Sequence, residues 1–333
     1  MRVNSVLKDF FQLIYLSLVR QAFKAMPFSL GILAAKGKGL YKYFFDRSLR
    51  GIVLNNVYQA FADVKSRKEL LKLTQSILKT AQVCAFCAYF HEKLSDRQIE
   101  NRFPVRGLEN LDNALQKGKG VILFSGHLGP HFIARYLLRQ KGYQVRGLRF
   151  KGAEDNGSNM RNASRLRARV EKLKIKRYVE PPECYFQVDF NARPVFKFLK
   201  QNGILINMGD GVHSLTYKKM DFLNNSIPFS LGTMSLARST GATVLPVYLQ
   251  GTPGNKDFET RIGEPFALQV TEDRQADIEE NTLIYVRCLE KQITEYPHNW
   301  RNWMYRDYFT RLEDFVSQET DKHSKVFGHG LSA

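Results

Sequence analysis

Residues 121–129 read VILFSGHLG, and this stretch decides the fold. Four consecutive apolar residues, Val121 to Phe124, are followed at once by a Ser-Gly pair. A short apolar run that ends in small residues is typical of a strand buried on both faces of a parallel sheet. The stretch therefore predicts a central strand, with His127 just after its end at the edge of the sheet.

The segments that follow alternate between strand and helix patterns. A helix is predicted over residues 130–140, with Pro130 at a favourable first position, and a second strand over 143–150. Further helices are predicted over 194–201, 231–240 and 278–297, and further strands over 203–208 and 243–249. This alternation indicates an α/β fold with a mostly parallel central sheet flanked by helices.

The first hundred residues carry a helical pattern instead. Apolar residues recur three and four positions apart, as at Leu70, Leu73 and Ile77, which is the spacing of one helix face. We therefore expect a helical N-terminal region over residues 1–100, an α/β domain over 101–318 and a polar C-terminal tail over 319–333.

The charge of the chain limits its partners. Fifty Lys and Arg against 32 Asp and Glu give a formal net charge of +18, which attracts nucleic acid, anionic lipid or phosphorylated substrates. The basic segment 161–177, predicted to be helical, suits an acidic protein partner, a phosphorylated ligand or a membrane surface, or is a solvated helix face.

The segment 6–19, VLKDFFQLIYLSLV, is the strongest candidate for membrane contact. Lys8, Asp9 and Gln12 interrupt it, and it is shorter than the roughly 20 apolar residues that span a bilayer. Its aromatic and aliphatic side chains, flanked by basic residues, favour a helix at a membrane interface. The alternative is an ordinary helix packed on the domain.

The four cysteines do not suggest a disulfide framework. Cys84 and Cys87 form a C-x-x-C inside an apolar run, where a zinc site would require a second ligand pair. We interpret them as two buried thiols.

The residue best suited to chemistry is His127. The flanking Gly126 and Gly129 expose its imidazole and allow a substrate to approach the backbone. Because ligands bind beyond the carboxyl ends of parallel strands, Asp210 and Gly211, which follow the strand over 203–208, are expected in the same crevice. A hydroxyl or amine that loses a proton to His127 could attack a thioester, with backbone amides of the following helix holding the oxyanion.

These residues also carry a family resemblance. Ser125 to Gly129 resembles the first motif of the bacterial lipid A late acyltransferases, the lauroyl and myristoyl transferases of the lysophospholipid and glycerol-phosphate acyltransferase superfamily. Asp210 resembles the aspartate of the family's mid-chain motif. Further segments resemble later family motifs in order and spacing, namely 221–223, 227–229, 232, 236–242, 244–247 and 293–306.

The resemblance implies an acyltransferase with no bound cofactor. An acyl carrier protein or coenzyme A thioester would be the acyl donor, and a glycolipid or lysophospholipid the acceptor. The enzyme would lie at the cytoplasmic face of a bacterial inner membrane, peripherally or by one N-terminal anchor, with anionic lipid and acyl carrier protein as partners and no nucleic acid. The substrate-binding residues would be Gly126, Gly129, Arg149, Gly211, Phe222, Pro228 and Gly232.

One position departs from the family pattern. The family carries an Asp or Glu five positions after the histidine, but this chain carries Phe132. A phenyl ring cannot orient an imidazole or stabilise its cation. Three explanations are open: Asp210 supplies the carboxylate, His131 enters as a relay, or the protein is a weak or inactive relative that binds lipid.

Two other classes of function are open. His127 and His131 could hold a metal with Asp210 or His213, although Pro130 disturbs the spacing of the histidines. The charge also permits a nucleic-acid-binding module, but the basic residues are not interleaved with a stacking platform of aromatic residues.

Overall fold

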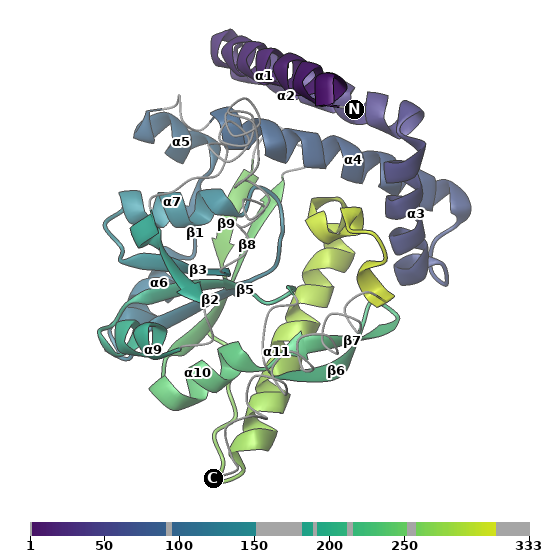
Figure 1. Cartoon of the computed structure of the whole chain (residues 1–333). Helices are drawn as coiled ribbons and strands as arrows, with labels where there is room; N and C mark the ends of the chain where they lie inside the picture. Colours follow the sequence, from purple (N-terminus) through teal and green to yellow (C-terminus); the bar gives the residue numbers. More distant parts are fainter. Residues whose placement is uncertain are drawn as a thin grey trace, which may run out of the picture.

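The computed structural model describes residues 2–90, 95–150, 182–188, 192–211, 216–251 and 258–310. Its centre is a seven-stranded sheet in the order β1-β9-β8-β2-β5-β3-β4. The strands span Val105–Arg106 (β1), Val121–Ser125 (β2), Val145–Phe150 (β3), Tyr185–Val188 (β4), Ile204–Met208 (β5), Thr243–Gly251 (β8) and Phe258–Ile262 (β9). All neighbours pair in parallel except β8 and β9. The predicted α/β fold with a mostly parallel sheet is therefore confirmed (Figure 1).

Helices cover this sheet and extend beyond it. They are α5 (Asp96–Arg102), α6 (Leu108–Leu115), α7 (Phe132–Gln140), α9 (Arg193–Lys200), α10 (Gly232–Thr240) and α11 (Arg274–Glu295). The predicted helices after residue 130 are present, but α7 begins at Phe132, two residues after Pro130. The predicted helix 161–177 and the tail 319–333 lie outside the described residues.

The N-terminal region is helical, as expected. Its helices are α1 (Arg2–Ala25), α2 (Phe28–Phe45), α3 (Arg47–Phe61) and α4 (Arg67–Phe90). Gly39 allows α2 to lie against α4, because a Cβ there would stand 2.5 Å from the Cα of Lys79. Buried side chains of α3 and α4 join the same hydrophobic core as those of β2 and β5, so these helices have a fixed position beside the sheet.

The outer surface of α1 and α2 exposes an unusual number of large apolar side chains. We call this set the apolar surface of α1 and α2; its members are Leu7, Phe10, Phe11, Ile14, Tyr15, Leu18, Leu30, Leu33, Tyr41, Phe44 and Phe45. Within the part of the chain that the structure describes, no helix has the length and apolarity needed to cross a bilayer.

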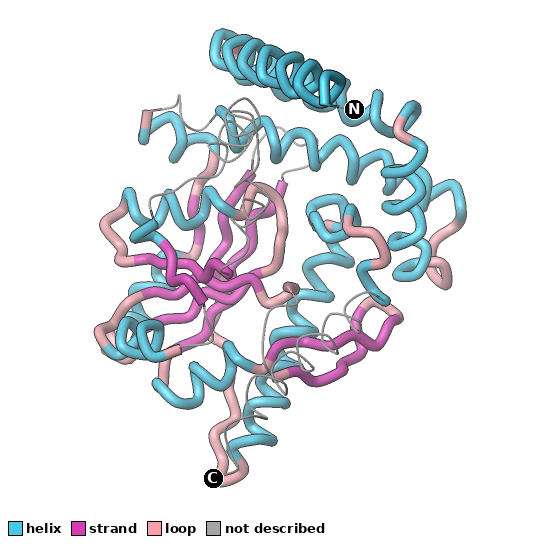
Figure 2. The backbone as a smooth tube through the Cα atoms, viewed as in Figure 1, coloured by secondary structure: helices cyan, strands magenta, loops and turns pink. Residues whose placement is uncertain are grey.

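A two-stranded hairpin and three short 3-10 helices complete the described part of the fold, and one of these 3-10 helices, Pro182–Cys184, precedes β4. The antiparallel strands β6 (Tyr217–Phe222) and β7 (Asn225–Ser230) lie beside α11 (Figure 2). The 3-10 helices Pro297–Asn299 and Arg301–Met304 follow α11 and return the chain to the end of β2, where Leu128 bridges Trp300.

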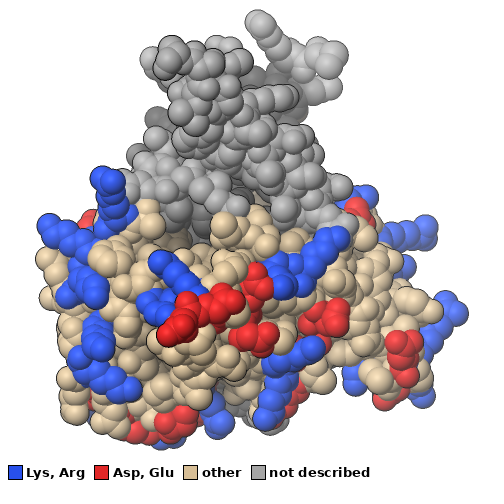
Figure 3. All heavy atoms as spheres, turned by 90° about the horizontal axis from the view of Figure 1, so that it is seen from below, with Lys and Arg blue, Asp and Glu red and all other residues tan. Residues whose placement is uncertain are grey.

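The surface seen from below does not carry a uniform positive field. Basic and acidic side chains are interspersed over the described part of this face (Figure 3). The net charge of +18 therefore does not by itself define a single binding surface here.

Candidate active site

The structure brings His127 and Asp210 together at the carboxyl ends of β2 and β5. The Asp210 carboxylate accepts from the His127 imidazole Nδ1 at 2.7 Å and from the His127 backbone N–H at 2.8 Å. The Asp210 side chain is fully buried, whereas 27% of the His127 side chain is exposed. An ionised carboxylate can only accept, so Nδ1 carries the proton and Nε2 is left as the basic nitrogen.

Two further donors hold the Asp210 carboxylate. The indole N–H of Trp300 and the side-chain amide of Asn302 donate to its Oδ2, at 2.8 and 3.0 Å. Burial by itself raises the pKa of Asp210, but the attraction of His127 and the hydrogen bonds from His127 and Trp300 outweigh burial and leave this pKa below its usual value. Asp210 is therefore ionised at neutral pH and fixed in orientation.

The segment that supplies Trp300 and Asn302 also binds the turn around His127. The Arg301 backbone N–H donates to the His127 carbonyl at 2.9 Å, and the Gly129 N–H donates to the Asn299 carbonyl at 2.8 Å. In the sequence this segment is recognisable only as part of a family motif, which assigns no role to Trp300 or Asn302. In the structure both side chains are buried, but no local sequence pattern encodes this burial.

Two glycines permit this geometry. A Cβ at Gly126 would stand 3.1 Å from the Asp210 carboxylate and 2.7 Å from Leu289, which would push the carboxylate away. Gly129 has a φ of +55°, and a Cβ there would stand 2.7 Å from the Leu249 carbonyl oxygen. A left-handed backbone in contact with another strand requires glycine, so both residues shape the turn that carries His127.

The comparison with protein families decides where this chain belongs. The family model described as bacterial lipid A biosynthesis acyltransferase matches residues 3–309. The chain is a member of this family. Membership confirms the resemblance drawn from the motifs and places the chain among acyltransferases that act on lipids.

Comparisons with individual proteins add little to the family assignment. None of the curated proteins matches the chain. One similar solved structure is the 1-acyl-sn-glycerophosphate (LPA) acyltransferase PlsC from Thermotoga maritima, which is 14% identical, with 88% of this chain and 99% of that chain covered and a TM-score of 0.32.

The position that departs from the family pattern lies close to the site. Phe132 begins α7 and packs against a hydrophobic core cluster, and the rings of His131 and Phe132 meet edge to face. The distance between His127 and Asp210 agrees with the first of the three explanations, in which Asp210 supplies the carboxylate that position 132 lacks. Its catalytic role stays a prediction.

His131 lies next to His127, immediately before α7. The two ring centroids are 5.0 Å apart, edge to face. Burial, followed by the positive charges of His127 and Arg301, holds the pKa of His131 well below its usual value. A histidine kept neutral in this way is a weak base, which disfavours the relay explanation.

The turn itself does not provide an oxyanion site. The N–H groups of His127, Leu128 and Gly129 donate to Asp210, the Gly126 carbonyl and the Asn299 carbonyl. Because each of these donors is used, the three amides of the turn are not available for the predicted oxyanion role.

The remaining predicted substrate-binding residues lie at several distances from the pair. Gly211 follows Asp210 directly, with open space at its Cβ position. Phe222 is fully buried and packs edge to face on Trp300, 5.7 Å between centroids. Pro228 is buried in β7 and Gly232 begins α10, while the Arg149 side chain lies outside what the structure describes. Their roles in binding substrate stay predictions.

The other reactive groups do not form a metal site. Over the described ranges there is no group of three His, Cys, Asp or Glu residues placed to hold a metal ion, and His213 lies outside those ranges. Cys84 and Cys87 are free thiols. Burial raises the pKa of Cys84 to about 12, so it is a protonated thiol at neutral pH. Cys87 is buried, as predicted, whereas Cys84 is only partly buried.

His131 is expected to make the fold of this family member sensitive to acid. Its lowered pKa means that the unfolded chain binds a proton below about pH 6.5 while the folded chain does not. The free energy of unfolding is therefore highest above about pH 6.5, where His131 is neutral in both states, and it falls as the pH falls below 6.5. His298, whose pKa burial also lowers, acts in the same direction.

Urea unfolding at pH 7.5 and pH 5.5 tests this expectation. We expect the free energy of unfolding of the wild type to fall more steeply with acid than that of His131→Gln, by up to about 1.4 kcal/mol per pH unit for one proton. Equal pH slopes for the two proteins would show that His131 ionises normally in the folded state.

Proposed function

We propose that this protein transfers a fatty acyl group from an acyl carrier protein or coenzyme A thioester to a glycolipid or lysophospholipid. His127 acts as the general base, and Asp210 orients it. The observation that supports the proposal most directly is the 2.7 Å hydrogen bond between the imidazole Nδ1 and a buried, ionised carboxylate. That arrangement leaves Nε2 as a base on a partly exposed ring.

The proposed reaction follows from this arrangement. Nε2 of His127 takes the proton from the acceptor hydroxyl as its oxygen attacks the thioester carbonyl carbon. The imidazolium that forms is stabilised by the Asp210 carboxylate. When the tetrahedral intermediate collapses, the C–S bond breaks, and the imidazolium returns its proton to the leaving thiolate. An ester is formed and a free thiol is released, so His127 ends in its starting state.

An acyl-transfer assay tests the proposal. Purified protein is incubated with a bacterial membrane lipid extract and a radiolabelled acyl group on either acyl carrier protein or coenzyme A. We expect label to enter a lipid product from at least one donor. If neither donor labels any lipid above a protein-free blank, the enzymatic proposal fails and a catalytically silent lipid-binding role replaces it.

We further propose that the apolar surface of α1 and α2 lies on the cytoplasmic leaflet of the inner membrane. At an anionic membrane, aromatic side chains that insert into the bilayer and basic residues that contact the headgroups both strengthen binding. Phe44 and Phe45, at the end of α2, are among the most exposed of these side chains, and Lys38 is exposed on the same helix. This arrangement would place the active site next to lipid acceptors.

Vesicle sedimentation tests the membrane proposal. With vesicles of phosphatidylglycerol and phosphatidylcholine, we expect Phe44→Glu and Phe45→Glu each to weaken binding about tenfold, because each loses the burial of one phenyl ring. Val270→Glu, which changes an equally exposed apolar residue near the start of α11, serves as the matched control. Equal loss in all three variants would contradict a docking surface on α2.

A further inference from the structure

A cavity beside the His127–Asp210 pair has no part in the proposed proton transfer. Its volume is about 410 Å³, and it lies between α2, α4 and the segment Pro297–Met304. His131 and Trp300 line it. Both also border the active site, since His131 contacts the His127 ring and Trp300 binds Asp210. The cavity and the catalytic pair are therefore neighbours that share a wall.

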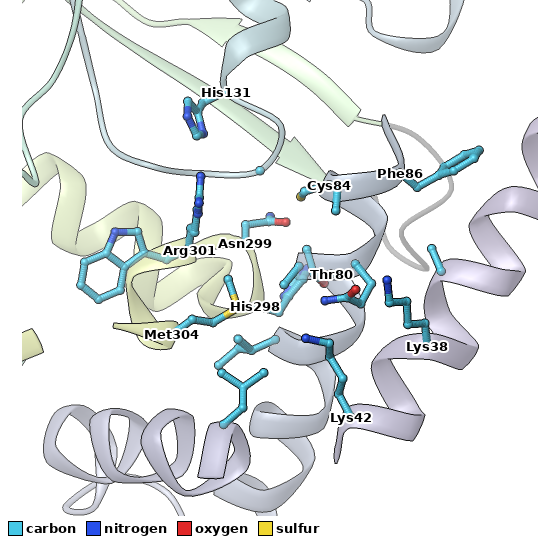
Figure 4. Close-up of a pocket in the computed structure, with 18 of the residues that line it drawn as sticks. Lys38, Lys42, Thr80, Cys84, Phe86, His131, His298, Asn299, Arg301 and Met304 are labelled. Carbon is cyan, nitrogen blue, oxygen red and sulfur yellow. The ribbon is translucent and has the colours of Figure 1, made fainter. Parts of the chain in front are cut away.

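The charged groups of this cavity are all positive. Lys38 and Lys42 project into it from α2, and Arg301 enters from the opposite side (Figure 4). The side chains of Lys42 and Arg301 form no ion pair with any described residue, and no Asp or Glu stands among the residues lining the cavity. Cations gathered in a recess without carboxylates favour an anionic ligand.

A buried amide in the same cavity indicates a ligand more specifically. Asn299 is only 3% exposed, yet neither its side-chain oxygen nor its nitrogen has a hydrogen-bond partner among the described residues. Buried polar groups in proteins are rarely left without partners. Donors and acceptors aimed into one recess therefore suit a ligand with both polar and anionic groups.

The surroundings favour a lipid headgroup over a soluble anion. Ile77, Phe132 and Met304 give the cavity apolar walls between its charged groups. The helix α2 lines the cavity and also carries Leu33, Phe44 and Phe45 on the apolar surface of α1 and α2. An amphiphile with its chains in a membrane along that surface could extend its headgroup into the cavity.

We infer that this cavity binds the phosphorylated headgroup of the lipid acceptor, an inference that rests on the proposed acyl transfer. Lys42 and Arg301 contact the phosphate, and Asn299 binds a neighbouring hydroxyl or amide of the headgroup. The guanidinium suits phosphate because its N–H groups match two phosphate oxygens at once.

Calorimetric titration without a thioester donor tests the inference, because binding is then measured with no chemistry. The probe is a short-chain lysophosphatidate below its micelle concentration. We expect Lys42→Gln and Arg301→Gln each to weaken its binding about tenfold, the loss typical of one charge-assisted contact. Lys72→Gln on α4, an exposed lysine outside the cavity, should bind as the wild type does. Thermal unfolding of each variant verifies its fold.

Two further probes separate the sources of phosphate. The matching monoacylglycerol, which lacks phosphate, should bind at least about tenfold more weakly, and inorganic phosphate should also bind more weakly than the lipid. Unchanged binding in both Lys42→Gln and Arg301→Gln would overturn the inference even if acyl transfer persists. Inorganic phosphate binding as tightly as the lipid would identify a soluble-anion site and overturn the headgroup assignment. An absence of acyl transfer together with the expected binding pattern would instead refute only the proposed catalysis.

Discussion

Replacing His127 with alanine is expected to lower acyl transfer by about a thousandfold or more, toward the level of the uncatalysed reaction. A positioned general base contributes roughly 10² to 10⁴ in rate, and the described part of the turn offers no substitute. The neighbouring His131 is held neutral by its surroundings, and Asp210 is a weak base because its pKa is lowered. Initial rates with the labelled thioester and lipid extract measure the loss.

The control for this substitution is Lys72→Gln. Lys72 is exposed on α4 and lies outside both the catalytic pair and the cavity. We expect this variant to keep most of the activity. Because His127→Ala removes a partly exposed ring, its thermal unfolding should remain cooperative. A His127→Ala protein as active as the wild type would end the role assigned to this histidine.

The meeting of His127 and Asp210 was predictable from local patterns. Both β2 and β5 appear in the sequence as short apolar runs, and parallel strands end at one edge of a sheet. The register pairs Ser125 with Met208, so His127 and Asp210 each stand two residues beyond a paired position. Strand periodicity and the direction of the chain together were enough to place these two side chains side by side.

The partners of Asp210 were not predictable in the same way. Trp300 and Asn302 reach the carboxylate from a segment about 90 residues later, and no periodic pattern in a sequence encodes such a contact. The edge strand β1 was missed because it has only two residues. The strand β4 was also missed, since four residues carry too little alternation to distinguish a strand from a loop.

The residue at position 132 shows where motif reasoning reaches its limit. The carboxylate expected at position 132 is absent. From the sequence alone, its absence predicts a loss of activity as readily as it predicts that another carboxylate takes its place. The spatial arrangement adds what the motif lacks, because the carboxylate that contacts His127 lies 83 residues away along the chain. Asp210 also accepts from Trp300 and Asn302, which makes it a more fixed partner than a single side chain on α7 would be.

Substituting Asp210 by asparagine is therefore expected to reduce acyl transfer by about a thousandfold, close to the effect of removing the histidine. An amide places N–H donors where two oxygens now accept from His127, Trp300 and Asn302. At least one donor then loses its partner, and Nδ1 of His127 is no longer held in its protonated form. Breaking a buried ionic contact also costs about 3 kcal/mol of stability, so urea unfolding should be measured together with the rate.

Asp277→Asn separates the catalytic loss from the structural one. Asp277 is an equally buried aspartate near the start of α11, the end of the helix that lies away from the active site. It pairs with Arg238 at 2.8 Å and accepts a hydrogen bond from Thr271. Its substitution should cost comparable stability and leave the turnover of the folded protein nearly unchanged. If Asp210→Asn loses no more activity than Asp277→Asn at matched folded fractions, Asp210 is a structural residue and His127 works without an orienting carboxylate. A large loss confined to Asp210→Asn assigns the orienting role to this carboxylate in place of the one missing at position 132.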